Sequence, residues 1–115
     1  YKRQIYYTES EAKALREAFE SQAIHWPKVT TRRMFGCPAY LVDGKLFAFL
    51  VTDGVVITQI RKRDREELEA AYEAAAFKAG EREISRWLQV TIDDLDRLQR
   101  VMTMVRRSYD AVLGY

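Results

Sequence analysis

The sequence is poor in the residues that build covalent or metal-held structure. It contains one cysteine, Cys37, and one histidine, His25. A single cysteine cannot form an internal disulfide, and one Cys with one His cannot supply the usual four ligands of a structural zinc site. A lone cysteine is also typical of a reducing compartment. We therefore expect a cytoplasmic protein with no metal and no cofactor.

Long apolar runs and a strong charge of one sign are missing as well. No stretch approaches the roughly 20 apolar residues of a membrane-spanning helix, so no membrane association is expected. The 19 Lys and Arg residues nearly balance the 17 Asp and Glu residues, which leaves a net charge of +2. That is far from the field of a dedicated nucleic-acid-binding protein. The length of 115 residues and the 48% hydrophobic content fit a single domain over residues 1–115.

Three apolar runs in the middle of the chain predict a β-meander. They cover residues 39–42, 46–51 and 55–60, and Asp43-Gly44 and Asp53-Gly54 separate them. An Asp-Gly pair between such runs is typical of a type I′ hairpin turn, which needs positive φ at both central residues. The sequence therefore predicts three antiparallel strands in succession.

The middle run of this meander is apolar on both sides of the predicted strand. A strand of this kind is covered on both faces, and we expect helices on one side and a helix or a second subunit on the other. Strict alternation would place on one face Phe47, Phe49 and Val51, and on the other Leu46, Ala48 and Leu50.

Capping signals predict a helix on either side of the meander. A capping box that begins at Thr8 predicts a first helix ending near Ala23. A second capping box at Asp64 predicts a helix whose apolar stripe reaches Ala79, because Gly80 is a typical C-terminal stop.

A third helix is predicted to begin at Thr91 or Asp93, with three aspartates in its first turn (residues 93, 94 and 96), and to end near Leu113. Val101 and Met104 widen its apolar stripe. The stripe is wide enough to pack on the sheet of its own domain and to contact a second helix in a homodimer, and both interpretations stay open. The main stripe consists of Leu95, Leu98, Met102, Val105, Tyr109 and Val112.

Together with strands predicted at residues 28–34 and 84–90, these elements define an α+β fold. We expect a twisted antiparallel sheet, formed by the meander plus one or two further strands and packed by three helices. The expected order is α-β(3)-α-β(2)-α.

Two motifs in this region resemble the signature of the TfoX N-terminal domain family. They are Arg33-Met34-Phe35-Gly36 and Tyr40-Leu41-Val42-Asp43-Gly44-Lys45-Leu46-Phe47-Ala48. The family's turn after Phe-Gly is usually glycine-rich, whereas here it is Cys37-Pro38. The resemblance implies a twisted antiparallel sheet backed by helices, similar to type III secretion chaperones and often dimeric. It also implies a domain found in regulators of competence for DNA uptake.

Basic residues cluster before and after the meander. Arg32 and Arg33 precede it, and Arg61, Lys62 and Arg63 follow it. If both clusters share one end of the sheet, they could form a phosphate-binding patch, which Arg106 and Arg107 could extend. The alternative is a solvated rim that the neighbouring glutamates partly neutralise. Within the family motif, Arg33 and Lys45 are the residues that we expect to contact a partner.

A catalytic set is not visible. Cys37 near Arg32, Arg33 and His25 could be an activated thiol, but no Cys-x-x-Cys partner exists, so a small buried or half-buried side chain in a tight turn is the favoured interpretation. The paired carboxylates at residues 66–69 and 93–96 lie in predicted first turns of helices, where the helix dipole favours negative charge. The sequence therefore predicts a non-enzymatic regulatory or protein-interaction domain, homodimeric and with an unknown protein partner. The alternative is a nucleic-acid-binding protein that uses the arginine and lysine clusters.

Overall fold

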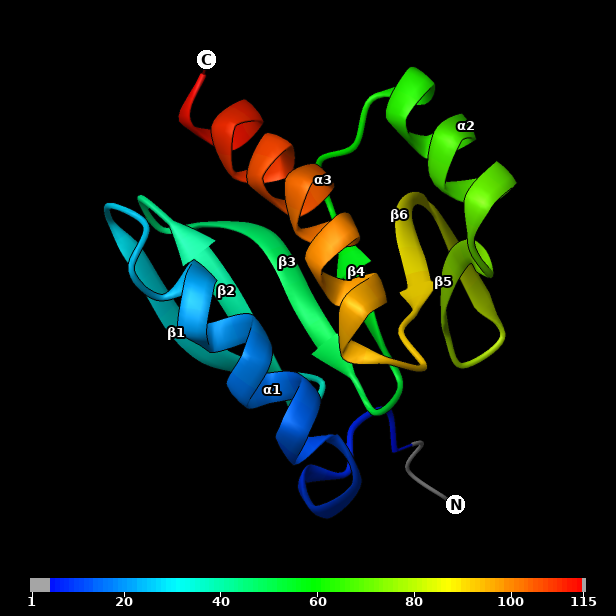
Figure 1. Cartoon of the computed structure of the whole chain (residues 1–115), viewed down its shortest axis with the longest axis horizontal. Helices are drawn as coiled ribbons and strands as arrows, with labels where there is room; N and C mark the ends of the chain where they lie inside the picture. The colour runs from blue at the N-terminus through cyan, green and yellow to red at the C-terminus, as the bar shows by residue number, and fades with distance from the viewer. Residues whose placement is uncertain (1–4, 115) are drawn as a thin grey trace.

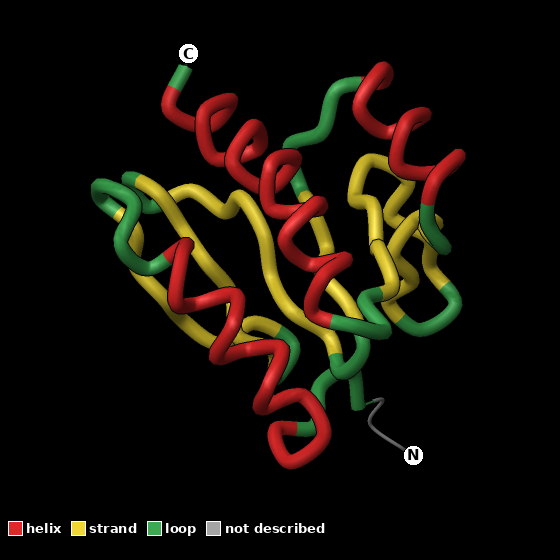
Figure 2. The backbone as a smooth tube through the Cα atoms, in the orientation of Figure 1, coloured by secondary structure: helices red, strands yellow, loops and turns green. Residues whose placement is uncertain are grey.

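A computed structural model describes residues 5–114, in which helices back one face of an antiparallel sheet (Figures 1 and 2). The predicted α+β class is confirmed. The sheet has six strands rather than four or five, with four before the second helix and two after it. In chain order the elements are α1 (Glu9–Ala23), β1 (Val29–Met34), β2 (Cys37–Val42), β3 (Lys45–Val51), β4 (Gly54–Ile57), α2 (Lys62–Ala71), β5 (Ala74–Ala79), β6 (Arg82–Thr91) and α3 (Leu95–Leu113).

The strands lie in the order β1-β2-β3-β4-β6-β5, and every neighbouring pair is antiparallel. The predicted meander is therefore correct, and β1 extends it. Asp43 and Gly44 both have positive φ, as a type I′ turn requires. Gly54 does not have positive φ, so the same prediction for the second turn is wrong. Gly54 instead begins β4, where its missing side chain makes room for the backbone of β6.

The second helix ends earlier than predicted. α2 stops at Ala71, and Ala74–Ala79 forms strand β5, which pairs with β6 across a turn at Gly80. Alanine favours helices, but burial of Phe77 against aromatic rings of β3 and β6 favours the strand. Tertiary packing overrides local preference in this segment.

Neither predicted capping box forms. The side chain of Thr8 makes no capping hydrogen bond. The backbone N–H of Thr8 donates to Oγ1 of Thr52 at 2.9 Å. α2 begins at Lys62, so Asp64 lies inside the helix, where its carboxylate accepts from Arg107. In α3, Asp94 caps the helix by accepting from the N–H of Arg97.

A bulge in β3 sends two phenylalanines to opposite faces of the sheet. The register of β2 with β3 shifts between Tyr40 and Leu41, which leaves Phe47 as the extra residue. Ser108 of α3 holds this bulge, because its Oγ donates to the carbonyl of Phe47 at 2.7 Å. The predicted sharing of one face by Phe47 and Phe49 is therefore wrong: Phe47 packs on Trp26 and Tyr109, and Phe49 on Phe77 and Trp87.

Both faces of β3 are covered within one chain. α1 and α3 lie in front of strands β1 to β4 (Figure 1), and the β5–β6 hairpin extends the sheet beyond β4. Phe77 and Trp87 of the hairpin pack on Phe49, and Tyr6 packs on Phe77. The second cover is thus neither a helix nor a second subunit.

The widened stripe of α3 lies inside the chain. Val101 is fully buried and Met104 is 9% exposed, so both belong to the core of this domain. These side chains offer a second copy little surface, and the homodimer stays a prediction. Within residues 5–114, no helix is both long and apolar enough to cross a membrane.

Candidate functional site

The two basic clusters lie at opposite ends of the sheet. Arg33 pairs with Pro38, so the first cluster lies where β1 ends and β2 begins. Strands β1 and β3 run in one direction and β2 and β4 in the other, which places the end of β4 at the same end of the sheet as the start of β3 (Figure 1). The second cluster, residues 61–63, comes shortly after β4 in the chain and therefore lies at that end of the sheet. The predicted patch that joins both clusters is therefore wrong.

The first cluster lies beside ion pairs that are already formed. Arg33 is exposed, and its Nη1 donates to the carbonyl of Gly36 at 2.9 Å, which fastens the β1–β2 turn. In the adjoining groove, Arg16 bridges Glu9 and Glu20, with both N–O distances at 2.9 Å. Hydrogen bonds from Arg16 lower the pKa of Glu9. Arg32 is exposed in the same groove, but the charges around it nearly balance.

The second cluster gains one more cation from α3. Arg107 donates to the carboxylate of Asp64 at 2.6 Å, which holds α3 against the start of α2. A hollow beside this contact is lined by Arg61, Arg63, Asp64, Glu67 and Arg107. We call the exposed cations at this end of the sheet the basic end. They are Arg61, Lys62, Arg63 and Arg107, together with Lys45, which lines a separate hollow with Gln59.

Cys37 is fully buried at the start of β2. Its Sγ lies 3.8 Å from the carbonyl of Phe35. Burial raises the pKa of the thiol to about 11, although the charge of Arg33 acts in the opposite direction. His25 is exposed at the end of α1. The geometry therefore favours the structural interpretation of Cys37 over the activated thiol.

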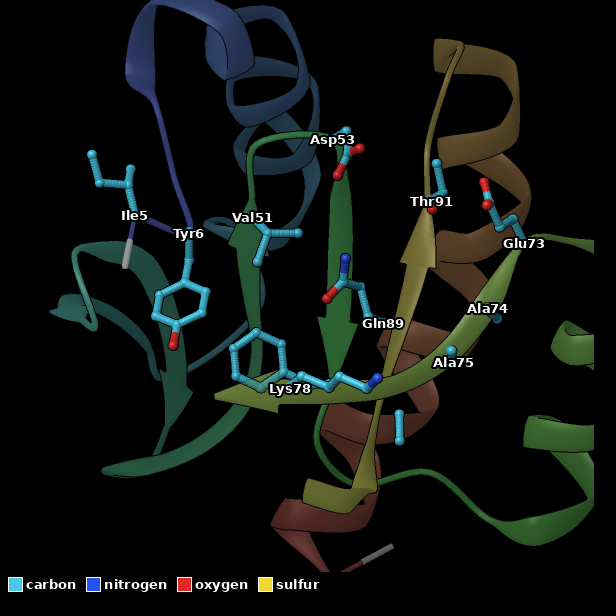
Figure 3. Close-up of a pocket in the computed structure, with 12 residues that line it drawn as sticks. Ile5, Tyr6, Val51, Asp53, Glu73, Ala74, Ala75, Lys78, Gln89 and Thr91 are labelled. Atoms are coloured by element: carbon cyan, nitrogen blue, oxygen red, sulfur yellow. The ribbon is translucent and has the colours of Figure 1, made fainter. Parts of the chain in front are cut away.

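A cleft that the sequence did not indicate lies beside β5 (Figure 3). Its volume is about 480 Å³, within the range of sites that bind ligands. We call it the β5 cleft. It is lined by Ile5, Tyr6, Val51, Asp53, residues 73–78, Gln89 and Thr91.

The two ends of the β5 cleft differ. Tyr6 closes one end, because its ring packs on Phe77 and its hydroxyl accepts from the N–H of Gly80 at 2.8 Å. Asp53 and Glu73 flank Thr91 at the other end (Figure 3). Backbone hydrogen bonds hold these two residues on either side of β6, since Thr91 donates to the carbonyl of Glu73 and Ile92 to that of Asp53.

The motif residues shape turns. Phe35, Gly36, Asp43 and Gly44 all have positive φ, and Arg33 bonds the carbonyl of Gly36. These residues therefore set the two tight turns that bound β2. Lys45 lies exposed at the first position of β3 and belongs to the basic end.

Helices on one face and a curled hairpin on the other define a small α+β domain with an open cleft in the curl. The family model of the TfoX N-terminal domain matches residues 21–112, which include all six strands, α2 and most of α3. The chain therefore belongs to the TfoX N-terminal domain family. Comparisons with curated proteins and with solved structures gave no significant match.

Proposed function

We propose that this chain is a non-enzymatic regulatory domain of the cytoplasm that binds a protein partner in the β5 cleft. The observation that carries the proposal is the composition of the cleft wall. Consecutive residues 73–78, including three alanines, line the cleft, so backbone and small side chains form much of its surface. Such a surface suits contact with another polypeptide.

The chemistry of the cleft supports a binding role over catalysis. Its charged groups are Asp53, Glu73 and Lys78, and all three are exposed. General acid–base work needs groups that converge on a reacting atom in a site closed to water. In residues 5–114, no group of three His, Cys, Asp or Glu side chains is arranged to hold a metal ion.

Filling the cleft tests this proposal. Ala75 is exposed and lines the cleft, so Ala75→Arg adds a long side chain there without disturbing the core. We expect the wild-type chain, used as bait in lysate of its source cells with quantitative mass spectrometry, to retain a partner that Ala75→Arg loses by about tenfold or more. Arg63→Gln, at the basic end, serves as the matched control and retains the partner. Equal capture by Ala75→Arg and wild type would contradict the proposal.

A second candidate function is nucleic-acid binding by the basic end. The supporting observation is that Lys45 and the arginines of α2 and α3 lie at one end of the sheet, although Asp64 and Glu67 offset part of their charge. Phosphate contacts release counterions, so binding by this surface would weaken steeply with salt.

Neutralising the α2 cluster tests this alternative. If the basic end binds DNA, labelled duplex or single-stranded DNA should show micromolar binding by fluorescence anisotropy at low salt, with log Kd rising linearly with log salt. Arg61→Gln, Lys62→Gln and Arg63→Gln combined should reduce that slope by about two to three. Arg32→Gln at the opposite end is the control. An unchanged slope in the triple variant would exclude the basic end as the DNA contact.

A further inference from the structure

β5 has an edge that can accept another strand. It is the last strand of the sheet, and β6 is its partner among the described residues. Edge strands present unpaired N–H and C=O groups, which natural proteins usually protect with charge or bulk. β5 carries instead Ala74, Ala75 and Ala76, whose side chains end at Cβ and leave the backbone accessible. This edge is therefore suited to pairing.

The opposite wall of the cleft is formed by the segment that precedes α1. Residues 5 and 6 lie before α1, and the carbonyl of Tyr6 accepts from the N–H of Thr52 at 3.0 Å. This contact fixes the N-terminal wall to the β3–β4 turn. The cleft thus runs between β5 and this segment, with apolar contacts available from Ile5, Tyr6 and Val51. Its shape fits an extended segment better than a compact molecule.

The charges of the cleft indicate what kind of segment fits. Asp53 and Glu73 lie at the open end, and among the described residues neither carboxylate has a salt-bridge partner. Lys78 lies toward the closed end of the same wall (Figure 3). A cationic group therefore gains at the open end, between the two carboxylates.

We propose that the β5 cleft binds an extended peptide segment that pairs with β5 and places a lysine or arginine between Asp53 and Glu73. An apolar residue further along the segment packs on Val51 and Tyr6. The inference rests on the proposed function, because it names the chemical class of the partner. It favours a cationic protein segment over nucleic acid, whose phosphates the two carboxylates would repel.

Peptide selection tests the preference directly. Random hexapeptides displayed on phage are selected on the immobilised full chain, and enriched peptides are synthesised for anisotropy measurements. We expect Lys or Arg at one end followed by alternating β-branched or apolar residues. Asp53→Asn with Glu73→Gln should weaken binding about tenfold or more, and N-methylation of alternate peptide amides should abolish it. Glu66→Gln with Glu69→Gln, on α2, removes the same charge away from the cleft and should leave binding unchanged.

Three results would overturn the inference: no enrichment, enrichment of acidic peptides, or binding that Ala75→Arg leaves intact. A lysate partner lost in Ala75→Arg, together with a failed peptide selection, would leave the proposed function standing and reject the cationic strand. The chain could instead self-associate in a way that Ala75→Arg abolishes, and show no peptide preference. That result would identify a second copy of the chain as the occupant of the cleft and would also reject the cationic peptide.

Discussion

Replacing Gly54 with alanine is expected to lower the free energy of unfolding by about 3 kcal/mol, at the upper end for an overpacked site. A Cβ at this position would lie 2.4 Å from the carbonyl oxygen of Val90 and 3.2 Å from its carbon. Both atoms belong to the backbone of β6, which pairs with β4, so neither can move without breaking the ladder. For a domain of this length the loss corresponds to a fall in Tm of roughly 12 °C, measurable by thermal and urea denaturation.

Gly44→Ala separates the steric clash from the effect of glycine flexibility. Gly44 has φ +79°, and beyond its chain neighbours no atom lies within 4 Å of the point that a Cβ would occupy. Alanine there costs only the strain of the left-handed conformation, about 1–2 kcal/mol. Equal losses in the two variants would show that the close approach of β6 is not what requires Gly54.

The elements that the sequence predicted correctly are those with local causes. The β2–β3 turn depends on Asp43 and Gly44 alone, and the positive φ of both follows from their residue types. α3 carries its own cap at Asp94 and an apolar stripe over five turns. These signals lie within a few residues of the structure that they determine, so a single sequence reveals them.

The β5 cleft could not be predicted in this way, because its wall depends on contacts distant in sequence. Residues 74–79 favour a helix locally, and only pairing with β6 and the burial of Phe77 against Phe49 make them a strand. Places where local preference loses to tertiary packing are often functional. The one local signal was Gly80 between two segments with aromatic or β-branched residues, which is also typical of a hairpin.

The separation of the basic clusters, in contrast, was already implied by the predicted strands. Arg32 and Arg33 end one strand, and three antiparallel strands follow before Arg61. An even number of antiparallel strands returns the chain to the end where the first one began. The second cluster therefore had to lie at the far end of the sheet, the end at which β1 begins.

Phe49→Ala is expected to lower the free energy of unfolding by about 4 kcal/mol, since its ring is fully buried. The ring contacts Phe77 and Trp87 with centroid distances of 5.1 and 5.4 Å, so it holds the β5–β6 hairpin against the sheet. Amide hydrogen exchange, measured by mass spectrometry under native conditions, should therefore accelerate in the hairpin before it does in α3. Peptide binding in the β5 cleft should weaken in parallel, because the hairpin forms its wall.

Phe47→Ala provides the matched comparison from two residues earlier in the same strand. It removes a ring of equal size and equal burial, but this ring packs on Tyr109 of α3 and on Trp26. The cost in stability should be similar, whereas the early exchange should move to α3 and leave the hairpin protected. If both variants open the same segment first, the bulge does not divide the core into two faces. The curled hairpin would then not be an independently held wall of the cleft.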